Sequence, residues 1–304
     1  MKSKNIIIGS RGSKLALIYA EIAKSKILES NKDFNIEIKK IITEGDLNIK
    51  DRLSDIGGKG LFSKKIEQEL RQKKIDLAVH ALKDMPSEEP KDLLTCCFLE
   101  RNDPREILIS KKNLTLNELP ANAIVGTSSF RREFQLKQIR KDLNFKLIRG
   151  NVDTRLKKLN TDSYDAIILS YAGLKSLNLD QNVSQFFSVS EIVPSAGQGV
   201  VALQCRKEDS NLINLLNKIN HVPTHNCILA ERSVLKILEG DCETAVGANA
   251  VIKNKEITLS AELFSIDGSK RFFNRDTKNL EESEKLGIEV GKKLKIESNN
   301  SYKK

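Results

Sequence analysis

The sequence of 304 residues has no tryptophan, only two methionines and few aromatic side chains, which make up 5% of the chain. Proteins that hold single-stranded nucleic acid stack its bases on rings interleaved with basic residues. The scarcity of rings therefore argues against a nucleic-acid partner, although the net charge is +10. A protein that used this charge to bind DNA would instead show an affinity that falls steeply with salt.

Long apolar runs are also missing. No stretch of 18 apolar residues occurs, so we expect neither a membrane-spanning helix nor a membrane partner. The first five residues lead into only three isoleucines before Gly9, which is too short for the core of a secretion signal. We therefore expect a cytoplasmic protein, and no feature of the sequence points to an obligate interface, so a monomer is expected.

The five cysteines do not have the regular spacing of a disulfide framework. Three lie in apolar stretches, where a thiol is usually a small core residue: Cys96, Cys97 and Cys205. His221, His225 and Cys227 are close in sequence, but a fourth zinc ligand is missing, so no metal is expected. Cys242 differs because it lies in a polar turn between a predicted helix and a predicted strand, where a thiol is available for covalent chemistry.

Short apolar runs that alternate with amphipathic segments predict an α/β fold. Predicted strands cover 5–8, 36–42, 76–80, 107–110, 124–126, 145–148, 166–170 and 200–205, and predicted helices cover 13–28 and 61–70 and follow Ser129 and Asn151. Beyond Pro223, a helix at 224–239, strands at 246–252, 256–264 and 271–275, and a helix at 281–296 predict a small α+β domain.

The restart of the pattern near residue 106 divides the chain into domains. We expect one lobe at 1–100 with about 199–218, a second lobe at 105–194, an α+β domain at 222–296, and a disordered tail at 297–304. The strand at 200–205 is expected to return to the first lobe. Two connections between the lobes would make a hinge beside a ligand cleft.

Three turns each follow a predicted strand and open a predicted helix: Ile8–Ser13, Val125–Arg132 and Ile148–Arg155. Helix N-termini attract anions, and each of these turns carries an arginine that can form a fork with a carboxylate. Seven of the 14 arginines also fall within 55 residues. Ordinary helix capping is the alternative for a single turn, but three such turns favour a small polyanion in an arginine-lined cleft.

Two further motifs lie near predicted strand ends. The run Gly57-Gly58-Lys59-Gly60 precedes a helix, and its low bulk indicates a mobile loop near a ligand or else a plain turn. It lacks the Walker spacing, and no dinucleotide fingerprint follows a strand, so no nucleotide is expected. Lys83 and Asp84 follow a buried apolar strand, where a carboxylate can stabilise a developing cation; a surface ion pair is the alternative reading.

Taken in order, the segments of this chain closely resemble the porphobilinogen deaminase (hydroxymethylbilane synthase) family. The resemblance rests on GSRGSKLAL, GDLNIKDRLSDIGGKGLFSKKIE, DLAVHALKDMP, ERNDPRE, VGTSSFRRE, LIRGNVDTRL, YDAIILSYAGL, PSAGQGVVALQCR, AER and LEGDC, which run nearly end to end. It implies two lobes like those of periplasmic binding proteins and a third domain that carries the cysteine loop. It also implies a transferase of porphyrin and heme biosynthesis, which joins four porphobilinogen units head to tail into hydroxymethylbilane and releases ammonia.

The resemblance also implies roles for individual residues. A dipyrromethane cofactor would be attached to Cys242 through a thioether, and Asp84 would be the catalytic carboxylate. Cofactor-binding positions would be Lys83, Thr127, Ser129, Arg131, Arg132 and Arg155, and substrate-binding positions would be Arg11, Ser13, Arg149, Arg155 and Gln198. Gly57, Gly58, Lys59 and Gly60 would form the mobile loop over the cleft.

The cysteine loop departs from the usual pattern of this family. Asp241 stands where a glycine is common, and Glu243 follows the cysteine. Two carboxylates beside a thiol raise its pKa, so slower cofactor attachment is expected. A two-lobed module that binds small anions without catalysis remains the alternative, and it would need neither Asp84 nor Cys242.

Overall fold

The computed structural model describes residues 4–47, 60–240 and 244–303. They fall into two compact units. The first holds 4–47, 60–102 and 199–225, and the second holds 103–198 and 226–303 apart from 241–243. Within the described ranges, no helix is long and apolar enough to cross a membrane.

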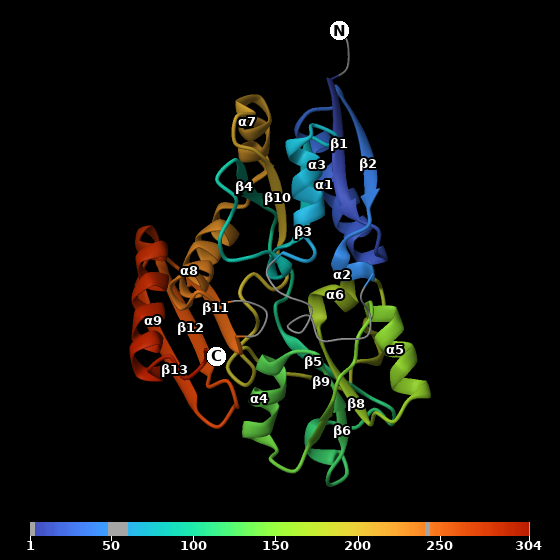
Figure 1. The fold of residues 1–304 in the computed structure, drawn as a ribbon, viewed down its shortest axis with the longest axis vertical. Coiled ribbons are helices and arrows are strands. Elements are labelled where there is room, and N and C mark those ends of the chain that lie inside the picture. The colour runs from blue at the N-terminus through green and yellow to red at the C-terminus, as the bar shows by residue number, and fades with distance from the viewer. Residues whose placement is uncertain (1–3, 48–59, 241–243, 304) are drawn as a thin grey trace. The chain divides into compact units, whose positions relative to one another are not determined.

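A five-stranded sheet of order β2-β1-β3-β10-β4 forms the first unit (Figure 1). Its strands are β1 (Lys4–Arg11), β2 (Phe34–Ile41), β3 (Leu77–Ala81), β4 (Leu93–Phe98) and β10 (Val201–Arg206). The first three are parallel, whereas β10 runs antiparallel to both β3 and β4. The expected return of the chain to the first sheet is therefore confirmed, because β10 follows all strands of the second sheet in sequence.

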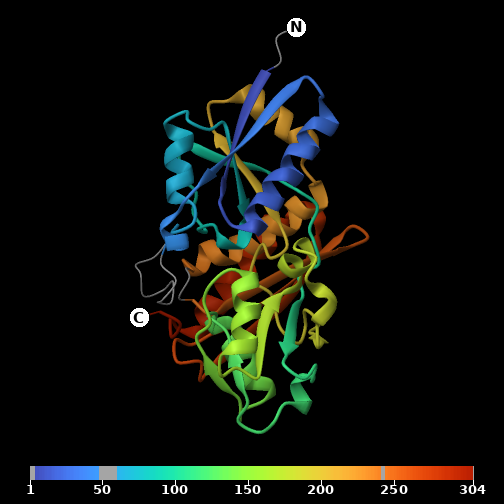
Figure 2. The ribbon, with the colours of Figure 1, turned by 90° about the vertical axis from the view of Figure 1, so that its right-hand side faces the viewer.

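Helices cover both faces of this sheet (Figure 2). On one face, α1 (Lys14–Ser30) and α7 (Ser210–Ile219) bury an apolar core that includes Ile8 and Leu203. On the other face, α3 (Lys64–Arg71) packs against the sheet through Ile66 and Leu70. A short helix, α2 (Glu44–Leu47), follows β2.

A second five-stranded sheet, of order β7-β6-β8-β5-β9, lies in the second unit. Its strands are β5 (Glu106–Ser110), β6 (Ile124–Gly126), β7 (Asn144–Lys146), β8 (Ala166–Ser170) and β9 (Gln185–Phe186), and its helices are α4 (Phe130–Ile139), α5 (Val152–Thr161) and α6 (Tyr171–Ser176). Strands β6, β7 and β8 are parallel, and β5 pairs antiparallel with β8. The helices follow the parallel strands, which is the arrangement of an α/β sheet.

The same unit contains a three-stranded antiparallel sheet covered by two helices. Its elements are α8 (Val222–Leu238), β11 (Val246–Lys253), β12 (Glu256–Phe264), β13 (Arg271–Asn279) and α9 (Ser283–Ser298). The helices pack closely, since a Cβ added to Gly287 of α9 would lie 2.1 Å from the carbonyl oxygen of Ala230 in α8. The two five-stranded sheets with their helices and the smaller three-stranded sheet with its two helices confirm the predicted fold class of two α/β lobes and a small α+β domain. The predicted domain boundaries stay predictions.

The predicted disorder of the tail is wrong for its described residues. Helix α9 extends to Ser298, and Asn299 and Asn300 then adopt left-handed φ angles of 45° and 57° that turn the chain back. Tyr302 is buried, and its hydroxyl donates a hydrogen bond to the carbonyl of Leu238 at 3.1 Å. The asparagine pair is thus the end of a helix rather than the start of a disordered segment.

Candidate functional site

Polar residues of the first unit gather where its parallel strands end. Arg11 is the last residue of β1, and the short 3-10 helix Leu82–Asp84 directly follows β3, so Lys83 and Asp84 lie at the same sheet edge. Ser13 caps α1 just after β1, and its hydroxyl oxygen accepts a hydrogen bond from the amide of Ala16 at 3.3 Å. This cap uses a lone pair of the oxygen and leaves the hydroxyl proton to other partners.

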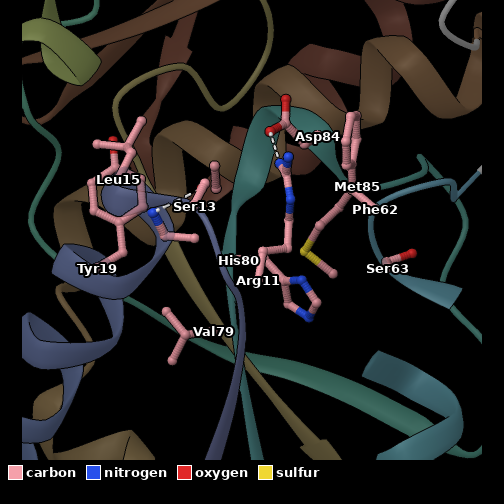
Figure 3. A pocket seen from close by; sticks show the side chains of 12 residues that line it. Arg11, Ser13, Leu15, Tyr19, Phe62, Ser63, Val79, His80, Asp84 and Met85 are labelled. Atoms are coloured by element: carbon pink, nitrogen blue, oxygen red, sulfur yellow. Dashed lines mark hydrogen bonds and ion pairs between the residues drawn. The ribbon is translucent and has the colours of Figure 1, made fainter. Parts of the chain in front are cut away.

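Arg11, Ser13 and Asp84 line one pocket, which Figure 3 shows from close by. Its wall includes Arg11, Ser13, Tyr19, Phe62, His80 and Asp84. The guanidinium of Arg11 lies 3.9 Å from the centre of the Phe62 ring, close enough for a cation–π contact. The Phe62 ring thus covers one face of the Arg11 guanidinium, while the guanidinium nitrogens reach two carboxylates.

Arg11 holds two carboxylates in different ways. Its Nη2 lies 2.5 Å from Asp46 Oδ1 and its Nε lies 3.1 Å from the same oxygen, whereas its Nη1 lies 3.7 Å from Asp84 Oδ2. Burial alone would raise the pKa of Asp46, but the hydrogen bonds and charge of Arg11, with help from Thr43, hold that pKa below its usual value. Asp84 is 35% exposed and lies beyond hydrogen-bond distance of Arg11, so its carboxylate faces a cation and stays accessible to a ligand.

His80 lies near the base of the Arg11 side chain and is only 7% exposed (Figure 3). Its Nε2 is hydrogen bonded to Gln204 Oε1 on the neighbouring strand β10, at 3.2 Å. Burial lowers the pKa of His80 to about 4, although Gln204 and the charge of Asp84 act in the opposite direction. The ring is therefore neutral at physiological pH and adds no second positive charge beside Arg11.

The second unit repeats this construction at the carboxyl ends of its parallel strands. Strand β6 ends at Gly126 and leads through Thr127 to Ser129, which caps α4 by accepting a hydrogen bond from the amide of Arg132 at 3.4 Å. Strand β7 leads to Gly150, whose φ of 112° is open to glycine, and then to α5. Two helix N-termini therefore follow parallel neighbouring strands, and amides there attract anions.

Two arginines of α4 are buried against one carboxylate. Arg131 Nη2 lies 2.6 Å from Glu106 Oε1 and Arg132 Nη2 lies 2.8 Å from Glu106 Oε2. Glu106 is fully buried at the start of β5, opposite Ser170 at the end of β8. Glu106 therefore serves two guanidinium groups, while buried Glu262, which pairs with Arg271, also acts on the charge of Arg131.

The remaining hydrogen-bonding capacity of these two arginines differs. Arg131 Nη1 donates to the carbonyl of Val193 at 2.8 Å. The Nε of Arg132 is buried, and the described part of the chain offers it no hydrogen-bond acceptor. A buried donor without an acceptor is costly, and a ligand carboxylate would relieve that cost.

Three other predicted site residues belong to the second unit. Arg149 is buried, and Arg155 in the first turn of α5 donates from Nε to the carbonyl of Gly150 at 2.8 Å. Gln198 is fully buried and donates from Nε2 to the carbonyl of Pro104 at 2.7 Å. Pro104 lies just before the first strand of this sheet in the sequence, and Gln198 lies after its last strand. The hydrogen bond therefore joins the chain segments that enter and leave the sheet.

Comparisons with known proteins agree with this arrangement. Residues 6–214 match the family model "Porphobilinogen deaminase, dipyromethane cofactor binding domain", and residues 225–296 match "Porphobilinogen deaminase, C-terminal domain". The chain belongs to the porphobilinogen deaminase family. It is therefore a transferase of tetrapyrrole biosynthesis, in a family whose larger domain binds a dipyrromethane cofactor.

Curated proteins named porphobilinogen deaminase are similar over nearly their whole length. That of Rickettsia typhi is 44% identical and the match covers 95% of this chain and 98% of the relative. Those of Alkaliphilus metalliredigens and Bacillus pumilus are 40% and 43% identical, and each match covers 96% of this chain, with 92% and 94% of the relatives. A solved substrate-binding domain of a putative amino acid ABC transporter from Streptococcus pneumoniae is more distant, with 17% identity, a TM-score of 0.45, and coverage of 71% of this chain and 91% of that chain.

Some residues predicted from the resemblance to the porphobilinogen deaminase family lie outside the described ranges. These are the cofactor cysteine Cys242, its neighbours Asp241 and Glu243, and the loop residues Gly57, Gly58 and Lys59. Gly60 is described, with a φ of 82° that favours glycine, directly before the turn that leads into α3. The family match gives the anion-binding module without catalysis no support.

Three residues of the described site were not predicted from the sequence. Asp46 orients Arg11, Phe62 covers its guanidinium, and Glu106 neutralises Arg131 and Arg132 in part. Asp46 and Phe62 lie inside a quoted family segment, but nothing in their spacing links them to Arg11, which is at least 35 residues away. Glu106 ends the quoted segment ERNDPRE and directly precedes the predicted strand 107–110, and the antiparallel pairing of β5 with β8 brings it to the edge where the arginines lie.

Proposed function

We propose that this member of the porphobilinogen deaminase family divides its chemistry between the two sheet edges described above. In the first unit, Asp84 would stabilise the positive charge that develops when porphobilinogen loses ammonia, with Arg11 and Lys83 beside it. In the second unit, arginines and helix N-termini would bind the carboxylates of the bound pyrroles. Asp84 carries this proposal, because it is a partly exposed carboxylate after a strand end and lies 3.7 Å from Arg11 Nη1.

The electrostatics of Arg11 support this role for Asp84. Loss of ammonia from porphobilinogen leaves an electron-deficient azafulvene, which a nearby carboxylate stabilises and a nearby cation destabilises. Asp46 takes the close hydrogen bonds of Arg11 and lowers the positive field at the pocket. His80 is neutral and adds none. The negative charge of Asp84 is therefore only partly compensated and remains available to the reacting ring.

The charge of the substrate accounts for the arginines. Every pyrrole unit carries an acetate and a propionate, so a chain of several units is a polyanion. Burying unpaired carboxylates is very costly, and guanidinium forks with helix N-termini compensate that cost. We assign Ser13 with Arg11 to the substrate at the first edge, and Arg149 and Arg155 to the growing chain at the second.

The residues of the second unit fit a dipyrromethane cofactor. The carboxylates of this cofactor require several cations and hydrogen-bond donors. The buried Nε of Arg132 is a donor that has no acceptor among the described residues. We propose that the residues of this unit that hold the group are Thr127, Ser129, Arg131, Arg132 and Arg155, with Cys242 as its covalent attachment, while Lys83 of the first unit stays a predicted cofactor position. When bound, this group supplies the pyrrole to which the first substrate unit is joined. Gln198 fixes a backbone segment that borders the same unit.

Replacement of Asp84 by asparagine tests the proposed division. Asp84→Asn removes the charge and keeps the shape, so turnover of porphobilinogen should fall by about 100-fold or more, while the intact mass still shows the cofactor. Asp92→Asn is the matched control. Asp92 is an exposed carboxylate that forms an ion pair with Arg71 at 2.6 Å, and neither residue lines the pocket. Wild-type turnover in Asp84→Asn would remove Asp84 as the catalytic carboxylate.

A further inference from the structure

The imidazole of His80 is a nearly buried polar group in the pocket of the first unit. It lines that pocket together with Arg11, Ser13 and Asp84, and the residue is only 7% exposed. One ring nitrogen, Nε2, is hydrogen bonded to Gln204 Oε1 at 3.2 Å. Within the described ranges, the other ring nitrogen, Nδ1, has no hydrogen-bond partner. One polar atom of this ring therefore remains for a ligand of the pocket.

Gln204 determines which ring nitrogen of His80 carries the proton. A side-chain amide oxygen only accepts hydrogen bonds, so Nε2 donates to Gln204 Oε1 and holds the single proton of the neutral ring. Gln204 is fully buried on β10, where its backbone pairs with Ala78 of β3 and Thr95 of β4. Burial lowers the pKa of His80 to about 4, so the ring is neutral at physiological pH. Nδ1 is therefore an acceptor and not a donor.

The pocket wall carries two kinds of hydrogen-bonding group. Arg11 and Ser13 offer N–H and O–H groups, which suit the carboxylates of a substrate. Asp84 and the Nδ1 of His80 offer only lone pairs, which repel a carboxylate and suit an N–H group. Figure 3 shows the His80 ring at the base of the Arg11 side chain, beside Met85. Porphobilinogen carries both matching groups, since it has two carboxylates, a ring N–H and an aminomethyl group.

We propose that His80 is a further substrate-binding residue, whose Nδ1 accepts a hydrogen bond from an N–H group of porphobilinogen, and that Gln204 is the positioning residue that keeps this nitrogen an acceptor. The inference rests on the proposed function, because it takes porphobilinogen as the ligand of this pocket. The N–H group belongs either to the pyrrole ring or to the aminomethyl group. In both cases the lone pair of Nδ1 excludes a carboxylate from this point and favours one orientation of the substrate.

Two variants of His80 separate the roles of its two nitrogens. The amide of His80→Gln reaches the position of Nε2 but not that of Nδ1, whereas the amide of His80→Asn lies near the position of Nδ1. We expect His80→Gln to raise KM for porphobilinogen about 10-fold and to change kcat less than about threefold, because the lost bond is made before and during the reaction. His80→Asn should recover most of the wild-type KM.

His221→Gln is the matched control for these variants. The Nδ1 of His221 is hydrogen bonded to Thr224 Oγ1 at 2.8 Å, and neither residue lines the pocket. Both kinetic constants of His221→Gln should equal those of the wild type. A rise of KM in His221→Gln equal to that in His80→Gln would show an indirect effect of histidine loss and would contradict the assignment of His80.

Nuclear magnetic resonance of the whole chain with 15N-labelled histidine tests the bond in the wild type, so this test does not depend on the folding of His80→Gln. Without ligand, His80 should show a protonated Nε2 and an unprotonated Nδ1, and Gln204→Leu should populate both tautomers. The first probe is porphobilinogen with a methyl group in place of its aminomethyl group, which cannot lose ammonia. A change of the Nδ1 signal with this probe assigns the bond to the ring N–H. A change only with porphobilinogen itself, added to Asp84→Asn, assigns the bond to the aminomethyl group.

The same methyl analogue distinguishes failure of this inference from failure of the proposed function. If the analogue inhibits turnover competitively but neither probe changes the Nδ1 signal, the site is filled without His80, and only the inference is overturned. A ligand-free ring with its proton on Nδ1, or equal KM values of His80→Gln and the wild type, would also overturn it. Wild-type turnover in Asp84→Asn would instead contradict the proposed function.

Discussion

His80 shows how burial sets the charge of a single side chain at the first sheet edge. It lies beside Arg11 and is hydrogen bonded to Gln204, and burial lowers its pKa to about 4. A protonated ring there would add a second cation next to the Asp84 carboxylate. Neutrality of His80 therefore preserves the partly uncompensated charge that the proposed chemistry requires.

The pKa of His80 predicts a loss of stability in mild acid. Its folded pKa lies below its ordinary value of 6.5, so the unfolded chain binds a proton that the folded chain does not. The contribution of the neutral His80 ring to the free energy of unfolding is fully present above pH 6.5. As the pH falls from 6.5 toward 4, this contribution is lost and the free energy of unfolding decreases by about 3 kcal/mol. The unfolding free energy of His80→Gln should therefore fall less than that of the wild type over this interval.

Nuclear magnetic resonance checks the same pKa directly. The chain has three histidines, so the ring of His80 can be assigned by comparison with His80→Gln. The His80 signals should not titrate until the pH approaches 4. Titration of His80 near 6.5 in the folded protein would contradict its burial as a neutral ring.

Among the secondary-structure elements, α4 depends on a buried charge cluster. Arg131 and Arg132 share Glu106, and removal of one member of a buried ion pair leaves uncompensated charge. Glu106→Gln should lower the unfolding free energy by about 3–5 kcal/mol in urea denaturation. The control Glu282→Gln breaks an exposed pair with Lys285 and should change it by less than about 1 kcal/mol. Equal small changes in the two variants would show that the cluster does not hold α4.

The segment after α9 is also a structural element. Tyr302 is 4% exposed and its hydroxyl reaches the carbonyl of Leu238 at the end of α8. Tyr302→Phe should cost about 1 kcal/mol through the lost hydrogen bond, and Tyr302→Ala about 3 kcal/mol through the lost packing. Urea denaturation measures both. Wild-type stability of Tyr302→Ala would restore the prediction of a disordered tail.

The predictability of the elements followed their hydrophobic pattern. Strands with short apolar runs, such as β1 and β8, and the long helix α8 were predicted near their observed positions. Strand β4 was not predicted, because its sequence resembles an apolar stretch around two cysteines. Helix α7 was not predicted either, because it follows strand β10, whose partner strands are distant in sequence. The tail was misread because Asn299 and Asn300 are common both in disorder and at helix ends.

The described site could be predicted only in part for a similar reason. Residues in turns after strands, such as Arg11, Ser129 and Asp84, carry local signals of strand, turn and helix. Their partners Asp46 and Glu106 carry none, since they reach the site through parallel or antiparallel pairing of strands far apart in the chain. Sequence reasoning therefore finds the groups that meet a ligand more readily than the groups that orient them.

For the whole molecule, the two α/β sheets share one construction. Each places turns and helix N-termini at the carboxyl ends of parallel strands, and each brings arginines to that edge. The net charge of +10 and this repetition suit the binding of a polyanion made of carboxylate-bearing pyrroles. A covalent primer at Cys242 would keep such a chain bound through successive additions, so the proposed attachment is central to the account.

The intact mass of the purified, active protein tests that claim most directly. The account predicts the polypeptide mass plus two pyrrole units, a positive pyrrole colour reaction after denaturation, and loss of both the added mass and turnover in Cys242→Ala. Cys227→Ala, which changes a buried thiol of α8, should keep the added mass. An unmodified mass in a preparation that turns over porphobilinogen would contradict attachment of the cofactor at Cys242.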